Sequence, residues 1–230
     1  QEDGKHLIIT GSAGDGKSAL LSRAFKHAQE EGVPLEESHI HMDATAARAK
    51  NQTYDETLDG FLESVSTCLD ANAGPRTGLA INLGLAINFF EQQDYRENYP
   101  ELWAAIDNTR NRVIHETDNI VVINLSHRDT YATAPDNLGG GLLASLVEKF
   151  AFDDPASPFH EAYRASQERC DAPDRCPLHY NARQFTDPAV RERVTELIAA
   201  SGLIHNSYLN PRAILDIISK MLVPDALQVV

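Results

Sequence analysis

The feature that most constrains this chain lies close to its start. Residues 11–18 read Gly-Ser-Ala-Gly-Asp-Gly-Lys-Ser and fit the pattern G-x-x-x-x-G-K-[ST]. Glycines at these positions let the backbone adopt turn conformations that other residues rarely reach. Successive N–H groups can then point inward and form a concave anion site. The stretch therefore predicts a loop that holds a negatively charged group.

The sequence on both sides of this motif gives the context that it requires. Residues 6–10 form a short apolar run that predicts a strand, and apolar residues at helical spacing follow Lys17. Gly32 and Pro34 end that predicted helix. A strand, a glycine-rich turn and a helix in this order are typical of the phosphate-binding loop (P-loop) of nucleotide-binding proteins. We expect the nucleotide to contact Gly11, Ser12, Ala13, Gly14, Asp15, Gly16, Lys17, Ser18 and Ala19.

A nucleotide bound in this way brings Mg²⁺ with it, and the ion needs oxygen ligands. In a P-loop the lysine, here Lys17, reaches the β- and γ-phosphates, and the hydroxyl of the next residue, here Ser18, ligates Mg²⁺. Residues 38–42 read as a second strand, and Asp43 follows it. This is where P-loop proteins keep a second Mg²⁺ contact, the Walker B acid. The alternative for Asp43 is to cap the helix that follows.

Polar residues follow two further predicted strands. Asn82 ends the strand predicted over residues 78–82, and Asn124 lies near the end of the apolar strand predicted over residues 119–125. Because ligands of open α/β sheets bind at the carboxyl ends of strands, Asn82 is a candidate sensor of the γ-phosphate. Its alternative is to cap the next helix. Asn124 and Arg128 are expected near the nucleotide or at a neighbouring subunit. Arg128 has two interpretations. It is either an arginine finger that acts on a neighbouring subunit or part of a surface salt bridge.

The chain is long enough for one large α/β domain with a small appendage. Residues 135–141 combine proline, aspartate, asparagine and three consecutive glycines, which indicates a boundary. We expect an α/β core over residues 1–135, with a parallel sheet flanked by helices. A small helical domain over residues 136–230 follows it, with helices predicted over residues 142–152, 160–169, 187–200 and 211–222.

Charge and cysteine content limit the partners and the compartment. The net charge is −14, which disfavours direct grip on a nucleic-acid backbone but leaves room for a basic partner subunit. Three cysteines do not indicate a disulfide scaffold, so a reducing cytoplasm is expected. The longest apolar run, residues 79–90, is too short to span a bilayer, and no signal peptide is visible. The chain begins with Gln1, so we expect it to be a piece of a longer protein.

One short stretch has the composition of a metal site. Cys170, Cys176 and His179 lie between two predicted helices, and with His160 they would supply four zinc ligands. The spacing is not that of a standard zinc knuckle. A loop with half-buried thiols is the favoured interpretation, a disulfide is disfavoured by the compartment, and Cys68 is expected in a helix facing the core.

The second half of the chain narrows the class of nucleotide-binding protein. No N-K-x-D motif, which GTPases of the Ras type use to recognise guanine, is present. Small-molecule kinases usually carry an arginine-rich lid over the phosphates, whereas the arginines of this chain are scattered. A P-loop core followed by helices, the last of which opens with Arg212, is similar to the AAA+ ATPases. In that family a "sensor 2" arginine contacts the γ-phosphate, so Arg212 is the candidate here. The alternative is an ion pair with Asp216 on the same helix.

Several short motifs in order extend this resemblance over most of the chain. They are Gly11-Ser12-Ala13-Gly14-Asp15-Gly16-Lys17-Ser18, His41-Met42-Asp43-Ala44-Thr45, Ala80-Ile81-Asn82-Leu83-Gly84, Asn88-Phe89, Cys176-Pro177, Tyr180-Asn181 and Pro211-Arg212-Ala213-Ile214-Leu215-Asp216. Together they resemble the DptF (DndF) family, ATPases of phosphorothioation-dependent bacterial DNA restriction. The resemblance implies ATP-driven work in a defence complex, with partner subunits and with DNA contacted indirectly or through those partners.

The sequence thus predicts an ATP-binding, Mg²⁺-dependent ATPase that forms a homo- or hetero-oligomer. A membrane is not expected among its partners. Lys17, Asp43 and Arg212 are the expected catalytic residues. No strand ends in Asp-Glu or Asp-Asp, so binding is better supported than hydrolysis. Two alternatives stay open, a nucleotide-gated scaffold or switch without turnover and a P-loop phosphotransferase.

Overall fold

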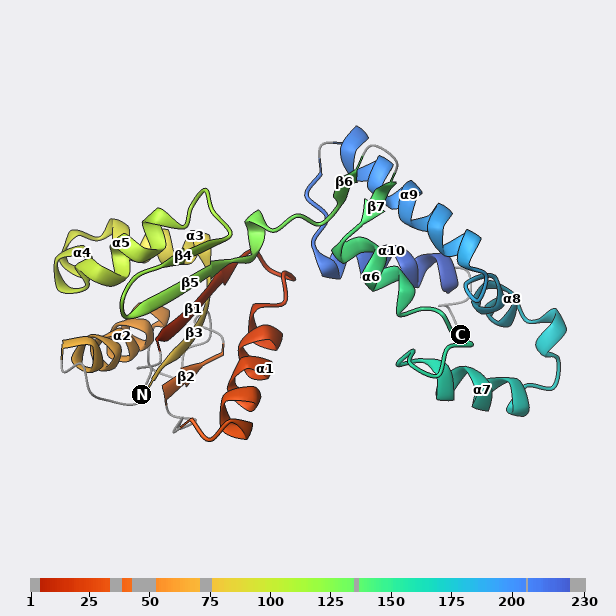
Figure 1. Ribbon diagram of the computed structural model, residues 1–230, viewed down its shortest axis with the longest axis horizontal. Helices are drawn as coiled ribbons and strands as arrows, with labels where there is room; N and C mark the ends of the chain where they lie inside the picture. The colour runs from red at the N-terminus through yellow and green to blue at the C-terminus, as the bar shows by residue number, and fades with distance from the viewer. Residues whose placement is uncertain are drawn as a thin grey trace. The chain divides into compact units, whose positions relative to one another are not determined.

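The computed structural model describes residues 5–33, 39–42, 53–70, 76–134, 137–205 and 207–223. The chain divides into two compact units, Gln1–Arg128 and Asp129–Val230. This division falls earlier in the chain than the boundary expected after residue 135. The two units are described separately below (Figure 1).

The first unit contains a five-stranded sheet in the order β2-β3-β1-β5-β4. Its strands are β1 (His6–Gly11), β2 (Ile40–His41), β3 (Gly78–Asn82), β4 (Ile114–Glu116) and β5 (Ile120–Asn124). Strand β1 pairs in parallel with β3 on one side and with β5 on the other. Strand β2 pairs in parallel with β3, whereas β4 runs antiparallel to β5 at the edge. The prediction of an α/β fold with a mostly parallel sheet flanked by helices is confirmed.

Alternate residues of β1 pack into different cores on the two faces of the sheet. Ile8 belongs to the core built with α2 (Tyr54–Asp70), α3 (Leu83–Glu91) and α5 (Pro100–Asn108). Ile9 packs with Leu21 of α1 (Lys17–Glu30). Short helix α4 (Gln93–Asn98) precedes α5, and Figure 1 shows α1 on the other side of the sheet from α2, α3, α4 and α5. Burial on both faces explains why β1 and β5 read as apolar runs.

Strand β4 was not predicted, because its sequence carries little of a strand's pattern. It is three residues long, and Ile114 is 56% exposed. The strand exists through its ladder with β5, in which Ile114 pairs with Ile123. A short edge strand of this kind depends on its neighbour more than on its own residues.

The second unit is mainly helical. Its helices are α6 (Leu142–Glu148), α7 (His160–Arg169), α8 (Pro177–Gln184), α9 (Pro188–Ile204) and α10 (Pro211–Leu222). Its core joins Leu143 and Val147 of α6 to Ile198 of α9 and to Ile214 and Ile218 of α10. Single helical turns described in the chain include η2 (Leu125–His127) after β5 and η3 (Pro173–Arg175) before α8.

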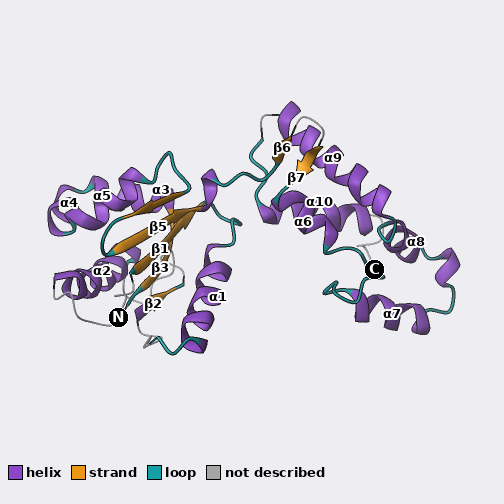
Figure 2. Cartoon of the chain, viewed as in Figure 1, coloured by secondary structure: helices purple, strands orange, loops and turns teal. Residues whose placement is uncertain are grey.

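A small antiparallel hairpin, β6 (Ala132–Ala134) and β7 (Asn137–Gly140), opens this unit (Figure 2). Residues 135–141 were read from the sequence as a domain boundary, and strand β7 was not predicted there. Glycine and asparagine have low strand propensity, but here β7 gains a ladder with β6 and contacts α9. Of the helices that the structure describes, none combines the length and the apolar character that crossing a bilayer requires.

Candidate functional site

The motif singled out in the sequence forms a turn at the carboxyl end of β1, the strand with parallel neighbours on both sides. We call residues 11–18 the glycine loop. Gly14 and Gly16 have positive φ angles of 87° and 91°. At Gly11, with φ 151°, a Cβ atom would lie 2.7 Å from Oδ2 of Asp15. The loop therefore needs glycine both for its backbone angles and for the close approach of the Asp15 side chain.

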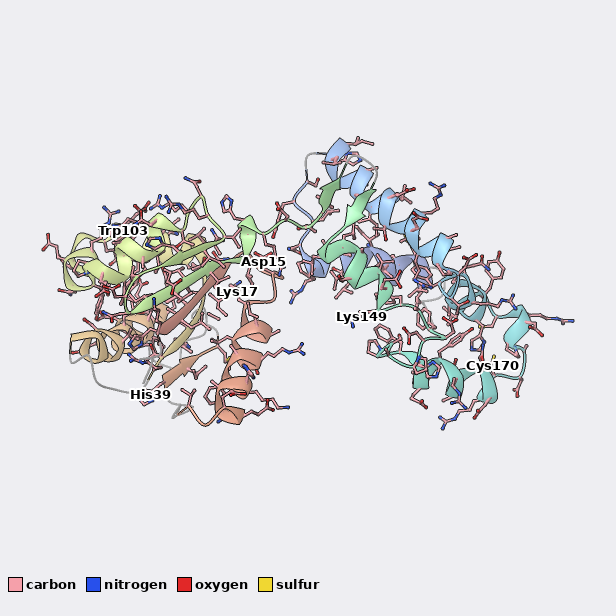
Figure 3. All side chains as sticks on the ribbon, in the orientation of Figure 1. Asp15, Lys17, His39, Trp103, Lys149 and Cys170 are labelled. Atoms are coloured by element: carbon pink, nitrogen blue, oxygen red, sulfur yellow. The ribbon has the colours of Figure 1, made fainter. Side chains whose placement is uncertain are left out.

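Lys17 is the first residue of α1, and its side chain turns back over the loop. Its Nζ donates a hydrogen bond to the carbonyl oxygen of Ser12 across 2.7 Å. Figure 3 shows Lys17 and Asp15 close together where β1 leads into α1. The ammonium group is thus held above the turn, at the mouth of the anion site that the motif predicts.

Ser18 links the start of α1 to the end of β2. Its hydroxyl donates to the carbonyl oxygen of Met42 across 2.7 Å. Strand β3 lies between β2 and β1, so the ends of three parallel strands lie along one edge beside the loop. Asp43, the residue after Met42 and the expected Walker B acid, lies outside the described residues. Its proposed contact with Mg²⁺ stays a prediction.

Asp15 is the buried polar centre of the glycine loop. Its side chain is 1% exposed, and its Oδ2 accepts hydrogen bonds from the Ser12 amide at 2.6 Å and from the Ser126 hydroxyl at 3.0 Å. Ser126 also lies 3.0 Å from the Ser12 amide nitrogen. Sequence reasoning missed Ser126, although a hydroxyl residue two positions after the end of β5 was a signal for it.

Arg128 braces the same loop from the end of the first unit. Its Nη2 donates to the backbone carbonyl of Asp15 across 2.9 Å. Its Nε is buried, and no hydrogen-bond partner for it is found among the described residues. The sequence had offered a finger toward another subunit or a surface salt bridge. Within this chain the guanidinium group instead supports the backbone of the glycine loop.

The two asparagines at strand ends have internal partners. Oδ1 of Asn82 accepts from the amides of Gly84 and Leu85, at 2.9 and 3.3 Å, and so caps α3. This is the capping alternative that the sequence left open. Asn124 is completely buried; its Nδ2 donates to the Thr109 carbonyl, and its Oδ1 accepts from the Ser126 amide. Asn124 therefore fixes the turn that carries Ser126, and a role beside the nucleotide stays a prediction for both asparagines.

The electrostatics at the start of α1 favour an anion. Gly16 is the N-cap residue of this 14-residue helix and offers no side chain to cap it, and the first turn holds no acidic residue. The positive end of the helix dipole and the Lys17 ammonium group act in the same direction. Ser12, Ser18 and Ala19 are exposed. The arrangement can accept a phosphate group at the N-terminus of the helix.

Arg212, the expected sensor arginine, belongs to the second unit. It is the second residue of α10, it is exposed, and Asn210 caps the helix by accepting from the Ala213 amide at 2.9 Å. In the part of the chain that the structure describes, no ion pair joins Arg212 to Asp216. Its contact with the γ-phosphate stays a prediction.

Comparisons with known proteins found no relative of this chain. A scan of protein-family models, a search of curated proteins and a search of solved structures returned no match to this chain.

Proposed function

We propose that this protein binds ATP at the glycine loop and hydrolyses it with Mg²⁺, as a P-loop NTPase. One observation carries the proposal. The Lys17 ammonium group lies over the Ser12 carbonyl at 2.7 Å, at the N-terminus of a helix without a side-chain cap. A cation, a helix dipole and glycines with positive φ together match the chemistry of a triphosphate. The missing guanine-reading motif favours ATP over GTP.

In this proposal each residue of the loop has a separate task. The loop amides, up to that of Ala19, hold the phosphates. When the nucleotide binds, the Lys17 ammonium group would leave the neutral Ser12 carbonyl and bind phosphate oxygens. The new hydrogen bonds are stronger, because both groups are then charged. Stabilising charge on the transferred phosphoryl group is mainly an electrostatic and positioning task.

The fit of Mg²⁺ depends on Ser18. Mg²⁺ prefers oxygen ligands, and the exposed Ser18 hydroxyl would turn from the Met42 carbonyl toward the ion. Asp43, one residue beyond Met42, is the proposed second ligand. When bound, Mg²⁺ would neutralise charge on the phosphates. The residues of this chain provide the oxygen atoms and hold the phosphates in place.

For the biological context we propose a subunit of a DNA restriction complex related to the DptF (DndF) family. The support is the resemblance of the short motifs given above. A net charge of −14 supports DNA contact through partner subunits rather than through this chain alone. A cytoplasmic location is part of the same proposal.

One observation favours a second candidate, a switch that binds ATP without turnover. The described partner of Ser18 is a backbone carbonyl, and the Asp15 carboxylate is occupied inside the loop. Neither group supplies an acid that would position water. A third candidate, a phosphotransferase, would use the same loop with an added acceptor.

Phosphate release separates the three candidates. Purified protein is incubated with Mg²⁺ and ATP, alone and with DNA or partner subunits, and free phosphate is measured beside the Lys17→Ala variant. The ATPase proposal predicts release that the variant lacks. Binding without release under every condition would overturn hydrolysis in favour of the switch. ATP consumption that needs an added acceptor and yields no free phosphate would support the phosphotransferase.

A further inference from the structure

A cluster of sulfur and nitrogen atoms lies in the second unit, separate from the glycine loop. Cys170 follows the end of α7, Cys176 is the residue before α8, and His179 lies in the first turn of α8. One potential ligand atom from each residue lies within 4.8 Å of the others. All three residues are partly buried, and both thiols are free. Figure 3 labels Cys170 near the end of α7.

The local chain is shaped to bring these groups together. Cys176 and His179 are three residues apart, so they share one face of the first helical turn. Pro177 occupies the first position of α8, where its fixed φ angle favours a helix start. The turn η3 folds the intervening residues back, with the Arg175 amide donating to the Ala172 carbonyl at 3.1 Å. This turn returns the chain from Cys170 to Cys176.

The hydrogen bonds of His179 fix its tautomer. The Ser166 hydroxyl donates its one proton to the Tyr163 carbonyl at 2.7 Å. It must therefore accept at its 2.9 Å contact with Nε2 of His179, so Nε2 carries the ring proton. Nδ1 then has the lone pair. It is buried, and no hydrogen-bond partner for it is found among the described residues.

This pattern is the one expected of a histidine that ligates a metal. Such a histidine presents one ring nitrogen to the ion, while its other N–H donates to a second group that fixes the ring. Here Ser166 is that second group. A disulfide between the two cysteines would leave the orientation of His179 and its unpartnered Nδ1 unexplained.

We propose that Cys170, Cys176 and Nδ1 of His179 bind one zinc ion. Zn²⁺ prefers sulfur and nitrogen ligands, at about 2.3 Å for sulfur, so two thiolates around one ion lie about 3.8 Å apart. The cluster needs only small side-chain rotations to close from 4.8 Å. On binding, each thiol loses its proton to solvent and the thiolate forms a bond to zinc.

We assign the fourth coordination position to water, because the cluster among the described residues supplies three ligands. The three residues line a pocket of about 570 Å³ whose walls include Phe152, Phe159 and Leu178. His160, the fourth ligand that the sequence offered, is not in the cluster, since its Nδ1 lies 2.9 Å from the Phe152 carbonyl. That part of the sequence prediction is wrong.

Zinc at this position would join α7 to α8. Helix α8 is already tied to α10, because Nδ2 of Asn181 donates to the Met221 and Leu222 carbonyls at 3.2 and 3.1 Å. Helix α7 has no buried residue of its own. The metal would therefore add a link to a helix that has little packing of its own, and removing zinc should lower the thermal midpoint of the protein.

Zinc content and cobalt spectra test the site. The full chain is expressed with zinc under reducing conditions, and metal per chain is measured for the parent and for Cys170→Ser, Cys176→Ser and His179→Asn. Cys68→Ser and His205→Asn serve as matched controls. We expect about one zinc per chain in the parent and the controls and a loss in the three variants. Cobalt in place of zinc should give thiolate charge-transfer and tetrahedral absorption bands.

The Ser166→Ala variant keeps the test independent of folding. Circular dichroism should be unchanged, while zinc affinity, measured by competition with a chromophoric chelator, should fall about 10- to 100-fold. Parent protein without zinc and without cobalt bands would overturn the proposal, as would equal metal content in parent and variants. Alkylation showing Cys170 and Cys176 joined in a disulfide in the reduced preparation would overturn it as well.

Discussion

The Asp15 carboxylate accepts a hydrogen bond from the Ser126 hydroxyl across 3.0 Å, so the end of β5 supports the glycine loop from inside. The two residues are 111 positions apart in the chain. They meet because β5 lies next to β1 in the sheet. The shape of the loop therefore depends on a residue far from the motif that identifies it.

Removing this support should weaken nucleotide binding moderately. Ser126→Ala deletes the hydroxyl that donates to the buried Asp15 carboxylate and contacts the Ser12 amide, and we expect a loss of about 1 kcal/mol or about fivefold in affinity. Titration with a fluorescent ATP analogue measures the effect. Ser145→Ala, which removes an exposed hydroxyl bonded to the Gly141 carbonyl, is the control. Equal affinity in both variants would show that the Asp15–Ser126 contact does not shape the site.

A methyl group at Gly11 should be more disruptive. Its Cβ would lie 2.7 Å from Oδ2 of Asp15 and 3.2 Å from Cβ of Leu125, at a φ angle that side chains rarely adopt. We expect Gly11→Ala to abolish ATP binding in the same titration. In Gly60→Ala, within α2, the new Cβ meets no atom within 4 Å. That control should bind normally and be more stable by about 0.5–1 kcal/mol. Normal ATP affinity in Gly11→Ala would contradict the described loop.

The contact between Ser18 and Met42 leads to a prediction about the Mg²⁺ concentration that phosphate release requires. Ser18→Ala and Asp43→Asn should each raise the Mg²⁺ concentration needed for half-maximal phosphate release, by tenfold or more. The reason is that each removes a proposed oxygen ligand. Asp94→Asn, at an exposed position in α4, is the matched control. An unchanged Mg²⁺ requirement in Asp43→Asn would remove that residue from the metal site.

His6 predicts a pH dependence of folding. Burial, with a smaller contribution from the Arg76 charge, lowers the pKa of His6 to about 4. The Thr77 amide donates to its Nδ1, so protonation would break that bond. Between pH 6.5 and pH 4 the unfolded state binds the proton and the folded state does not. Stability is therefore lost as pH falls through this window, by about 2 kcal/mol from pH 7 to pH 5.

Urea unfolding of the parent and of His6→Gln at pH 7 and pH 5 checks this effect. The glutamine can accept from the Thr77 amide but does not titrate in this range. The parent should lose more stability than the variant on acidification. Equal losses would show that His6 is not held neutral in the fold.

The central parts of the fold could be predicted, because their signals are local. Strand β3 has the predicted bounds, and β1 and α1 follow from the apolar residues around the glycine motif. Strand β4 and the β6–β7 hairpin were missed because pairing with a neighbouring strand stabilises them more than their own side chains do.

The candidate site also has residues that the sequence predicts and residues that only the fold brings into it. Lys17 and Ser18 follow from the motif alone. Ser126 and the bracing role of Arg128 require the placement of β5 beside β1, which the spacing of residues does not show. The orientation of His179 likewise depends on Ser166, a residue from a different helix.

Equilibrium binding of Mg²⁺-ATP by the parent and by Lys17→Ala tests the central claim most directly. The matched control is Lys26→Ala, because Lys26 lies on the same helix and its only described ion pair is an exposed one with Glu30. We predict saturable binding by the parent and the control. Lys17→Ala should lose affinity by about 100-fold, since a charged hydrogen bond to phosphate is removed. ATP binding by Lys17→Ala equal to that of the parent, or no binding by the parent, would contradict the account.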